Sequence, residues 1–465
     1  MAKISDTFSV GIIFFFGFLC NFLSKMKVPN IIGMIIIGII IGPEVLKLIS
    51  DNINTISSEL RSIALVIIFT RTGLNLDFST LKKIGRPSIL LAFIPSIFEI
   101  FGETLASIWL LKLNTFESML LGSVIAPISP AVVSVRMLNL IEKRYGEKNN
   151  VPKIILAGSS IDDIFVIILF YAFIPLAESS DFEPKTLLAI PISIILGIIL
   201  GLIIGIIIIF VLKKTNFEDY INLLLIFSVT LLMKGLESYI DEITKGTNVN
   251  YMSISGLLGI IVLGILILYK NPIKCKQLSS NYNYIWKFFE IIVFITVGAN
   301  LKFTKEVINN IGYSICVILI GLVFRSIGVF LCLIKTGLNI KEKIFCIISY
   351  IPKATVQASI GGIPLSRGLK CGDLVLSVSI ISIILAGSVG ALLIDLLGYK
   401  LLEKENKEDN KNIENCKNEK ENINKNGNKF IDNSENVQEN IIKSEDNKIV
   451  NECDKLNINN NKQIK

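Results

Sequence analysis

Two adjacent aspartates, Asp162 and Asp163, stand in the apolar segment GSSIDDIFVI. A charge at the centre of a membrane helix costs roughly 2.5–3.5 kcal/mol to insert, so such carboxylates must pair, take up protons or face water. Close carboxylates increase each other's affinity for protons, and their oxygens also bind small hard cations. With Ser129 and Ser159 as further oxygen ligands, the pattern indicates a site where protons compete with a metal ion such as Na⁺ or Li⁺. The alternative is a structural acid pair bridged to hydroxyls such as Ser159.

Three further ionisable residues, Glu99, Arg325 and Lys353, also interrupt long apolar segments. Together with the two aspartates they are nearly balanced in charge, so pairing is feasible. Arginine essentially never releases its proton, and we therefore expect a Glu99–Arg325 ion pair to be structural. Lys353 is placed to compensate the carbonyl ends of interrupted helices.

Prolines mark two apolar segments as broken helices. APISPAVVSV holds Pro127 and Pro130, and YIPKATVQASIGGIP holds Pro352 beside Lys353. Proline removes a backbone donor and clashes with the preceding turn of a helix. Two interrupted helices in corresponding positions of two halves point to a binding site at the membrane midplane.

Apolar segments of membrane-spanning length must position these residues. The sequence has 465 residues, of which 52% are hydrophobic, and its mean hydropathy is +0.63. It predicts an all-α, polytopic protein of the cell (inner) membrane, with about 13 transmembrane helices. The predicted spans are 8–24, 30–46, 57–73, 87–112, 117–140, 154–176, 188–212, 218–240, 254–270, 285–301, 311–335, 344–366 and 373–398.

Basic residues predict the orientation of these spans. Lys and Arg concentrate in the loops that follow odd-numbered spans, for example Lys143, Arg144 and Lys335. Because basic loops stay in the cytoplasm, the N-terminus is expected outside and the C-terminal end inside. The bias also accounts for the net charge of +7 without nucleic acid as a partner.

Two inverted repeats are predicted by a simple shift of the numbering. Adding 226 positions places Glu99 on Arg325 and Pro127 on Lys353, and an odd number of spans separates the two halves. Residues 1–400 are therefore predicted to form the transmembrane domain, with repeats at about 8–176 and 218–398 and a linker helix at 188–212. Residues 401–465 are mostly Lys, Glu, Asn, Asp and Ile, and predict a disordered, charged cytoplasmic tail.

Other kinds of site are not indicated. The chain has no histidine, its eight cysteines form no CxxC motif, and neither a P-loop nor a GxGxxG motif occurs at a strand-to-helix junction. We therefore expect no cofactor, no His-ligated metal and no enzymatic activity.

The segments SPAVVSVRMLNL, AGSSIDDIFVI and IPKATVQASIGGIPL, together with RTGLNLD and IPSIFEI, carry a family resemblance. They resemble the signature segments of monovalent cation/proton antiporters of the NhaA/NapA superfamily, most closely its NHA-type branch. The similarity covers residues 8–398.

The resemblance implies two inverted repeats with crossed broken helices, a mobile core, a dimerisation domain and a homodimer in the lipid bilayer. It also implies that Asp163 is the main ligand of the cation and the proton, with Asp162 as its partner. In members of the wider family, a lysine often forms a salt bridge with the first aspartate. Here Arg325 occupies the matching helix, which favours electroneutral exchange.

The expected function is therefore sodium(lithium)/proton antiport by alternating access, serving pH homeostasis. Exchange of potassium or ammonium for protons, or channel-like cation efflux, remains the alternative within transport. A membrane sensor that transports nothing, with a tail that recruits partners, is the alternative outside it.

Overall fold

The computed structural model describes residues 4–23, 30–76, 85–178, 184–215, 217–244 and 254–405. The chain divides into two units, Met1–Glu403 and Lys404–Lys465. The predicted tail lies outside the described residues apart from its first five positions. Of these, Leu402 is buried and the carbonyl of Glu403 accepts a hydrogen bond from the amide of Gly146.

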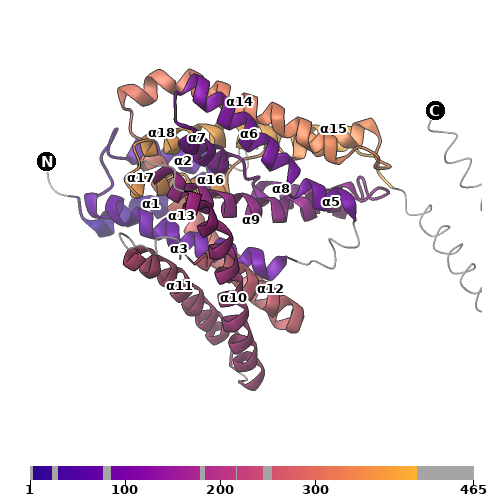
Figure 1. Ribbon diagram of the computed structural model, residues 1–465, viewed down its shortest axis with the longest axis horizontal. Helices are drawn as coiled ribbons and strands as arrows, with labels where there is room; N and C mark the ends of the chain where they lie inside the picture. Colours follow the sequence, from indigo (N-terminus) through magenta and orange to yellow (C-terminus); the bar gives the residue numbers. More distant parts are fainter. Residues whose placement is uncertain are drawn as a thin grey trace, which may run out of the picture. The chain divides into compact units, whose positions relative to one another are not determined.

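The first unit is built from helices (Figure 1). Its N-terminal half contains α1 (Asp6–Leu23), α2 (Asn30–Ile41), α3 (Asp51–Asn75), α5 (Arg86–Leu91), α6 (Ile94–Leu110), α7 (Thr115–Ile125), α8 (Pro130–Glu142) and α9 (Val151–Glu178). Next come α10 (Pro184–Lys214), α11 (Asp219–Thr244), α12 (Gly256–Lys270), α13 (Pro272–Ala299) and α14 (Lys305–Cys332). The last are α15 (Ile340–Ser349), α16 (Thr355–Ile360), α17 (Ile363–Ser366), α18 (Gly372–Ser382), the π-helical turn η2 (Ile383–Gly387) and α19 (Ser388–Leu401).

Local signals explain where the two broken helices begin. Asn114 before α7 and Asn339 before α15 each accept a hydrogen bond from the backbone of a glutamate three residues on. The carboxylates of those glutamates, Glu117 and Glu342, accept a hydrogen bond from the backbone amide of the asparagine and complete a capping box. Such boxes satisfy donors that a helix start leaves open. The sequence thus starts both helices in the same way, although they lie in different halves.

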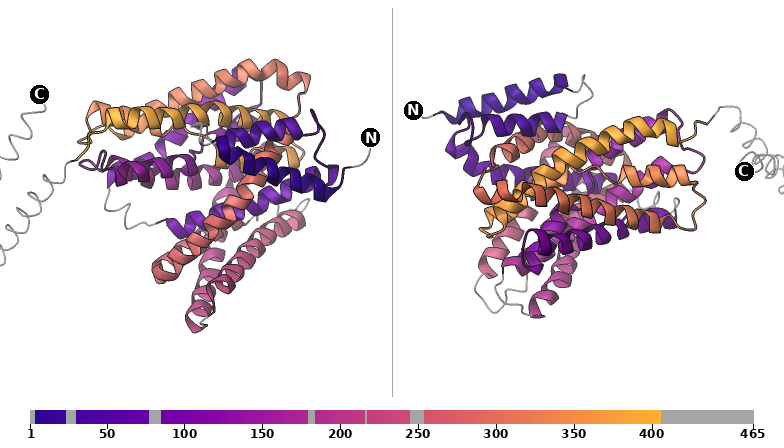
Figure 2. Two further views of the ribbon diagram at one scale, coloured as in Figure 1. Left: turned by 180° about the vertical axis from the view of Figure 1, so that it is seen from behind. Right: turned by 90° about the horizontal axis from the view of Figure 1, so that it is seen from above.

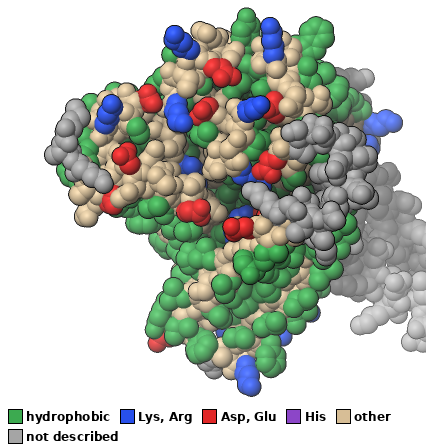
Figure 3. Space-filling view, turned by 60° about the vertical axis from the view of Figure 1, so that its left-hand side comes forward, with side chains coloured by type: hydrophobic (Ala, Val, Ile, Leu, Met, Phe, Trp, Pro, Cys, Tyr) green, Lys and Arg blue, Asp and Glu red, His purple; other side chains and the backbone are tan. Residues whose placement is uncertain are grey.

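Many of the helices are apolar enough to cross a membrane. Within the described residues, seven helical segments meet this requirement by length and composition: Asp51–Asn75, Arg86–Leu110, Val151–Glu178, Pro191–Lys214, Asp219–Thr244, Lys305–Cys332 and Gly372–Leu401. Four shorter apolar helices accompany them: Asp6–Cys20, Asn30–Ile41, Thr115–Ile125 and Gly256–Lys270. The space-filling view shows apolar side chains over much of one face, with charged ones gathered in part of it (Figure 3). The chain is therefore an all-helical, multi-pass membrane protein.

Several predicted boundaries differ from the observed helices. The span predicted at 87–112 is interrupted at Ala92–Phe93, because Pro95 cannot donate to the preceding turn. The span predicted at 344–366 comprises α15, α16 and α17. Helix α13 begins at Pro272, well before the predicted start at 285, because its first turns are polar and carry no hydropathy signal.

The helices pack in two groups that position the site. Helix α14 lies along α6, and α7 and α9 pack beside them, whereas α10, α12, α3, α13 and α2 pack against one another. Figure 1 shows α6, α14 and α15 on its upper side and α10 and α11 below, and Figure 2 gives the same arrangement from behind and above. The short helix α16 contacts both groups, through α7 and α18 on one side and α3 and α13 on the other. The second broken segment therefore lies between the two groups of helices.

Candidate functional site

Two interrupted helices meet at the centre of the site. Helix α7 ends at Ile125 and α8 begins at Pro130, while α15 ends at Ser349 and α16 begins at Thr355. The amide of Ser129 in the first break donates to the carbonyl of Pro352 in the second, at 2.9 Å. The side-chain amide of Gln357 donates back to the carbonyls of Ile125 and Pro127, at 2.9 and 2.5 Å. The predicted prolines thus lie at breaks that are joined by hydrogen bonds.

Two cations lie at the carbonyl end of α7. The carbonyl of Ala126 accepts from Lys353 Nζ and from Arg325 Nη1, each at 2.6 Å. A helix end exposes unpaired carbonyls and carries about half a negative charge, so cations stabilise it. Lys353 Nζ thus lies at the carbonyl end of α7, and compensation of the broken helix stays a prediction for it.

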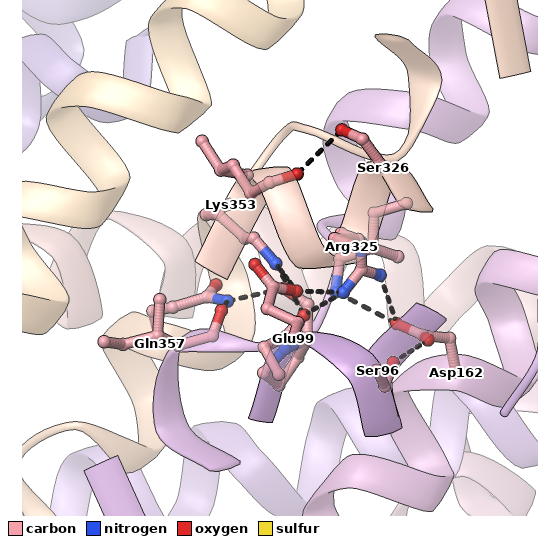
Figure 4. Close-up of polar contacts among 12 residues, drawn as sticks. Ser96, Glu99, Asp162, Arg325, Ser326, Lys353 and Gln357 are labelled. Carbon is pink, nitrogen blue, oxygen red and sulfur yellow. Dashed lines mark hydrogen bonds and ion pairs between the residues drawn. The ribbon is translucent and has the colours of Figure 1, made fainter. Parts of the chain in front are cut away.

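Three helices and the second break contribute to one buried ion network, shown in Figure 4. Arg325 of α14 pairs with Glu99 of α6 through Nη1 and with Asp162 of α9 through Nη2, the latter at 2.9 Å. Lys353 Nζ lies 2.7 Å from the same oxygen of Glu99, Oε2. All four side chains are at most 2% exposed, so none of these charges is screened by water. The close packing of α6 on α14 brings the first pair together.

The first aspartate of the adjacent pair is fully engaged. Ser96 of α6 donates to Asp162 Oδ1, while Oδ2 accepts from Arg325 and, at 3.4 Å, from the amide of Ile128. Both carboxylate oxygens of Asp162 therefore have hydrogen-bond donors, and Oδ2 also has a cation beside it. Asp162 is therefore held in the network, and its partners are Ser96 and Arg325 instead of the serines beside it.

The second aspartate has a different environment. Asp163 is 6% exposed, and its buried Oδ1 has no hydrogen-bond partner in the described part of the chain. Adjacent residues of a helix point about 100° apart, so Asp163 does not share the ligands of Asp162. It lies within electrostatic range of Asp162, Arg325 and Lys353. Asp163 Oδ1 is thus a buried acceptor without a donor among the described residues.

The two predicted serine ligands lie differently. Ser129 is buried in the first break, and its hydroxyl has no partner among the described residues. Ser159 donates to the carbonyl of Leu156 in its own helix, at 3.1 Å. Ser129 therefore lies in the break between α7 and α8, whereas the hydroxyl of Ser159 is bonded within α9.

Sequence reasoning missed three polar residues of the site. Ser96 and Glu103 lie three positions before and four after Glu99, which puts them on one face of α6. Helical spacing around Glu99 was therefore the signal that could have found them. Gln357 follows Lys353 by four residues, and only the structure shows that it reaches across to the other break.

The described residues contain no group of three or more His, Cys, Asp or Glu side chains placed to hold a metal ion.

Comparison with known proteins identifies the family. The family model described as "Sodium/hydrogen exchanger, transmembrane" matches residues 10–396. The chain belongs to the sodium/hydrogen exchanger family. This confirms the predicted resemblance to monovalent cation/proton antiporters, and exchange of sodium for protons follows for the family.

Individual relatives agree with this membership. Sodium/hydrogen exchanger 9B2 from Bison bison bison is 33% identical over 388 residues, which cover 81% of this chain and 70% of the relative. The protein of the same name from Homo sapiens is 29% identical over 387 residues, with the same shares. Among solved structures, the sodium proton antiporter MjNhaP1 from Methanocaldococcus jannaschii at pH 8 superposes with a TM-score of 0.70. It is 20% identical, and the match covers 84% of this chain and 98% of that one, so it supports the fold.

Proposed function

We propose that this exchanger carries Na⁺ or Li⁺ against protons at Asp163, which binds the cation and the proton alternately. One observation carries the proposal. Asp163 is a buried carboxylate beside two joined helix breaks, and its Oδ1 has no partner among the described residues, while Asp162 beside it is engaged at both oxygens. Competition between ions for one site is the simplest basis of antiport.

In this proposal the remaining charges hold the site together. Glu99 and Asp162 contribute two negative charges, and Arg325 and Lys353 contribute two positive ones. The network is therefore balanced without Asp163. One monovalent cation, or one proton, neutralises the remaining carboxylate, which favours electroneutral exchange. Arg325 does not carry the transported proton, because arginine remains protonated in proteins.

We further propose that the chain crosses the membrane about 13 times as two inverted repeats, in a transmembrane domain of residues 1–400. Ala126 and Pro352 are equivalent under the shift of 226 positions, and the carbonyl of each accepts a hydrogen bond from the other break. The two capping boxes are similarly related, since Asn114 and Asn339 differ by 225 positions. Paired features of this kind support inverted halves, whose relative motion would give alternating access.

The orientation belongs to the same proposal. Asn149, in the basic loop between α8 and α9, donates to Glu342 at the start of α15, at 2.9 Å. The amide of Gly146 in that loop bonds to the carbonyl of Glu403. Two basic loops and the end of α19 therefore share one side, which the positive-inside rule assigns to the cytoplasm. The N-terminus would then be outside and residues 401–465 in the cytoplasm.

Proton flux in proteoliposomes tests the ion site. With an imposed pH gradient, we expect sodium or lithium to collapse the gradient in the parent protein. Asp163→Asn should lower this flux at least ~100-fold, because the amide cannot exchange a proton for a cation. Serine variants of α9, such as Ser160→Ala, control for folding, since Ser160 only bonds within its helix.

Each outcome of this assay decides between the proposed antiporter and one of the alternative functions. Full activity of folded Asp163→Asn would remove Asp163 from the ion site. A response to potassium alone would favour the potassium exchanger, and uncoupled conductive flux a channel. If no cation changes the pH gradient although the protein is demonstrably folded, the result would favour a membrane sensor that transports nothing. Light scattering on the purified protein tests the expected homodimer.

A further inference from the structure

A fourth buried carboxylate, beside those of Glu99, Asp162 and Asp163, lies near the ion network but forms no ion pair with it. Glu103 follows Glu99 by one helical turn on α6 and is completely buried. Neither of its carboxyl oxygens has a hydrogen-bond partner in the described ranges. The ion pairs of the network involve Glu99 and Asp162, and none of them reaches Glu103.

The surroundings of Glu103 disfavour a negative charge. The charged groups that act on it are Glu99 on its own helix, Arg325 on α14 and Lys353 in the second break. Glu99 repels a second carboxylate, and both cations are already bound to Glu99 or Asp162 and to the carbonyl of Ala126. A buried carboxylate without hydrogen bonds or its own counter-ion is costly, and such a group takes up a proton instead.

Helix α14 packs closely against the side chain of Glu103 at Gly321. A Cβ at Gly321 of α14 would lie 2.5 Å from both Cγ and Oε1 of Glu103. Any larger residue at position 321 would therefore overlap with the carboxyl group. The absence of a side chain at Gly321 thus lets α14 lie directly against this carboxyl, and the contact seals it from solvent.

We propose that Glu103 is a second proton-binding site, which holds a resident proton that is not exchanged for the cation. The site itself follows from the packing of Glu103, but its role rests on the proposed function of Asp163. With Glu103 neutral, Asp163 is the one carboxylate of this group without a compensating charge. Ionised Glu103 would add a second such charge, and one cation per cycle would no longer neutralise the core.

Infrared spectroscopy of the full-length protein in liposomes tests this site. The carbonyl stretch of a protonated carboxylic acid is separate from the bands of carboxylates and amides. At neutral pH in saturating sodium, we expect this band in the parent protein and in Asp163→Asn, and its loss in Glu103→Gln. Glu117→Gln, at the start of α7, is the control for loss of a carboxyl elsewhere.

Three results would overturn the proposal: no such band in the parent, a band that survives in Glu103→Gln, or loss of the band when sodium is added to Asp163→Asn. The third would mean that Glu103 itself releases its proton to the cation. Because the band is measured without transport, it tests Glu103 even if sodium-dependent flux proves absent and the role of Asp163 falls.

Two neutral replacements keep the test independent of one variant. If Glu103 is uncharged, Glu103→Gln and the apolar Glu103→Met should both fold, with melting temperatures within a few degrees of the parent. If Glu103 were ionised and compensated Arg325 or Lys353, both replacements would leave a buried cation without its counter-ion and destabilise the protein. Failure of both to fold would therefore contradict a resident proton.

Discussion

Two groups of buried charges in this protein lie at helix ends of opposite polarity. In the ion network, Arg325 and Lys353 meet the carbonyl of Ala126 at the end of α7. In a second group, Glu237 of α11 meets the start of α12, where its Oε2 accepts from the amides of Gly256 and Leu257, at 2.9 and 3.3 Å. Cations thus compensate a helix C-terminus in one region, and an anion compensates a helix N-terminus in the other.

The two groups differ in how completely their oxygens are used. Oε1 of Glu237 pairs with Lys234 at 2.6 Å, so both of its oxygens are occupied. Lys234 also lies 5.3 Å from the ring centre of Tyr171. Around the network, in contrast, oxygens of Glu99, Glu103 and Asp163 lack partners among the described residues. Both oxygens of Glu237 are thus used in structural contacts, whereas the oxygen of Asp163 that lacks a partner is the one that the proposed function assigns to the exchanged ion.

The largest expected effect comes from removing the central cation of the network. Arg325→Met leaves Glu99 with Lys353 alone and removes the one counter-ion that Asp162 has among the described residues. We expect a loss of about 3–5 kcal/mol in the free energy of unfolding, together with loss of sodium-dependent proton flux. Thermal unfolding in detergent and flux in proteoliposomes measure the two effects.

Arg325→Lys is the matched control for that change. It keeps the charge but cannot reach Glu99, Asp162 and Ala126 with one planar group, so an intermediate loss is expected. If Arg325→Met protein were stable and active, the ion pairs of Arg325 would not be needed to hold the structure around Asp163.

A smaller effect is expected in the second group, and it should spare transport. Glu237→Gln keeps the shape of the side chain but leaves Lys234 without its counter-ion and weakens the bonds to α12. We expect a loss of about 1–3 kcal/mol in the free energy of unfolding. Sodium-dependent flux per folded molecule should remain that of the parent, because Glu237 lies outside the ion network.

A double variant separates the charge effect from the shape effect. Replacing a whole buried ion pair by apolar groups is often neutral, whereas removing one partner is not. Adding Lys234→Met to Glu237→Gln should therefore restore part of the lost stability. If instead Glu237→Gln alone abolished sodium dependence, the division between a structural and a transporting group would fail.

Local sequence signals predicted the parts of the site that depend on local physics. Pro127, Pro130 and Pro352 lie at breaks, where the backbone donor that proline lacks is not needed, although Pro175 lies inside the continuous helix α9. The contact between Glu99 and Arg325 was predicted from the shift of 226 positions, which places one residue on the other. Pro95 carried the same signal for the α5–α6 interruption, although the predicted span at 87–112 ignored it.

Contacts between helices were not predictable in the same way. Asp162 bonds to Ser96, 66 positions earlier, and Gln357 bonds to carbonyls about 230 positions away. No spacing in the chain encodes the rotation of α6 against α9 on which the first contact depends. The different environments of Asp162 and Asp163 therefore emerged only from the packing, although the pair itself is plain in the sequence.

The smallest expected effect is at Tyr350, which caps α15 beside the network. The Arg325 guanidinium lies 5.4 Å from its ring centre, while its buried hydroxyl has no hydrogen-bond partner among the described residues. Tyr350→Phe keeps the ring and its attraction for the cation. The free energy of unfolding should therefore change by less than about 0.5 kcal/mol, and the sodium-dependent proton flux should be retained. Tyr350→Leu removes the ring and should cost about 1–2 kcal/mol more. A strong loss of flux in Tyr350→Phe, with unchanged melting, would instead assign the hydroxyl to the ion pathway and extend the site from Asp163 to α15.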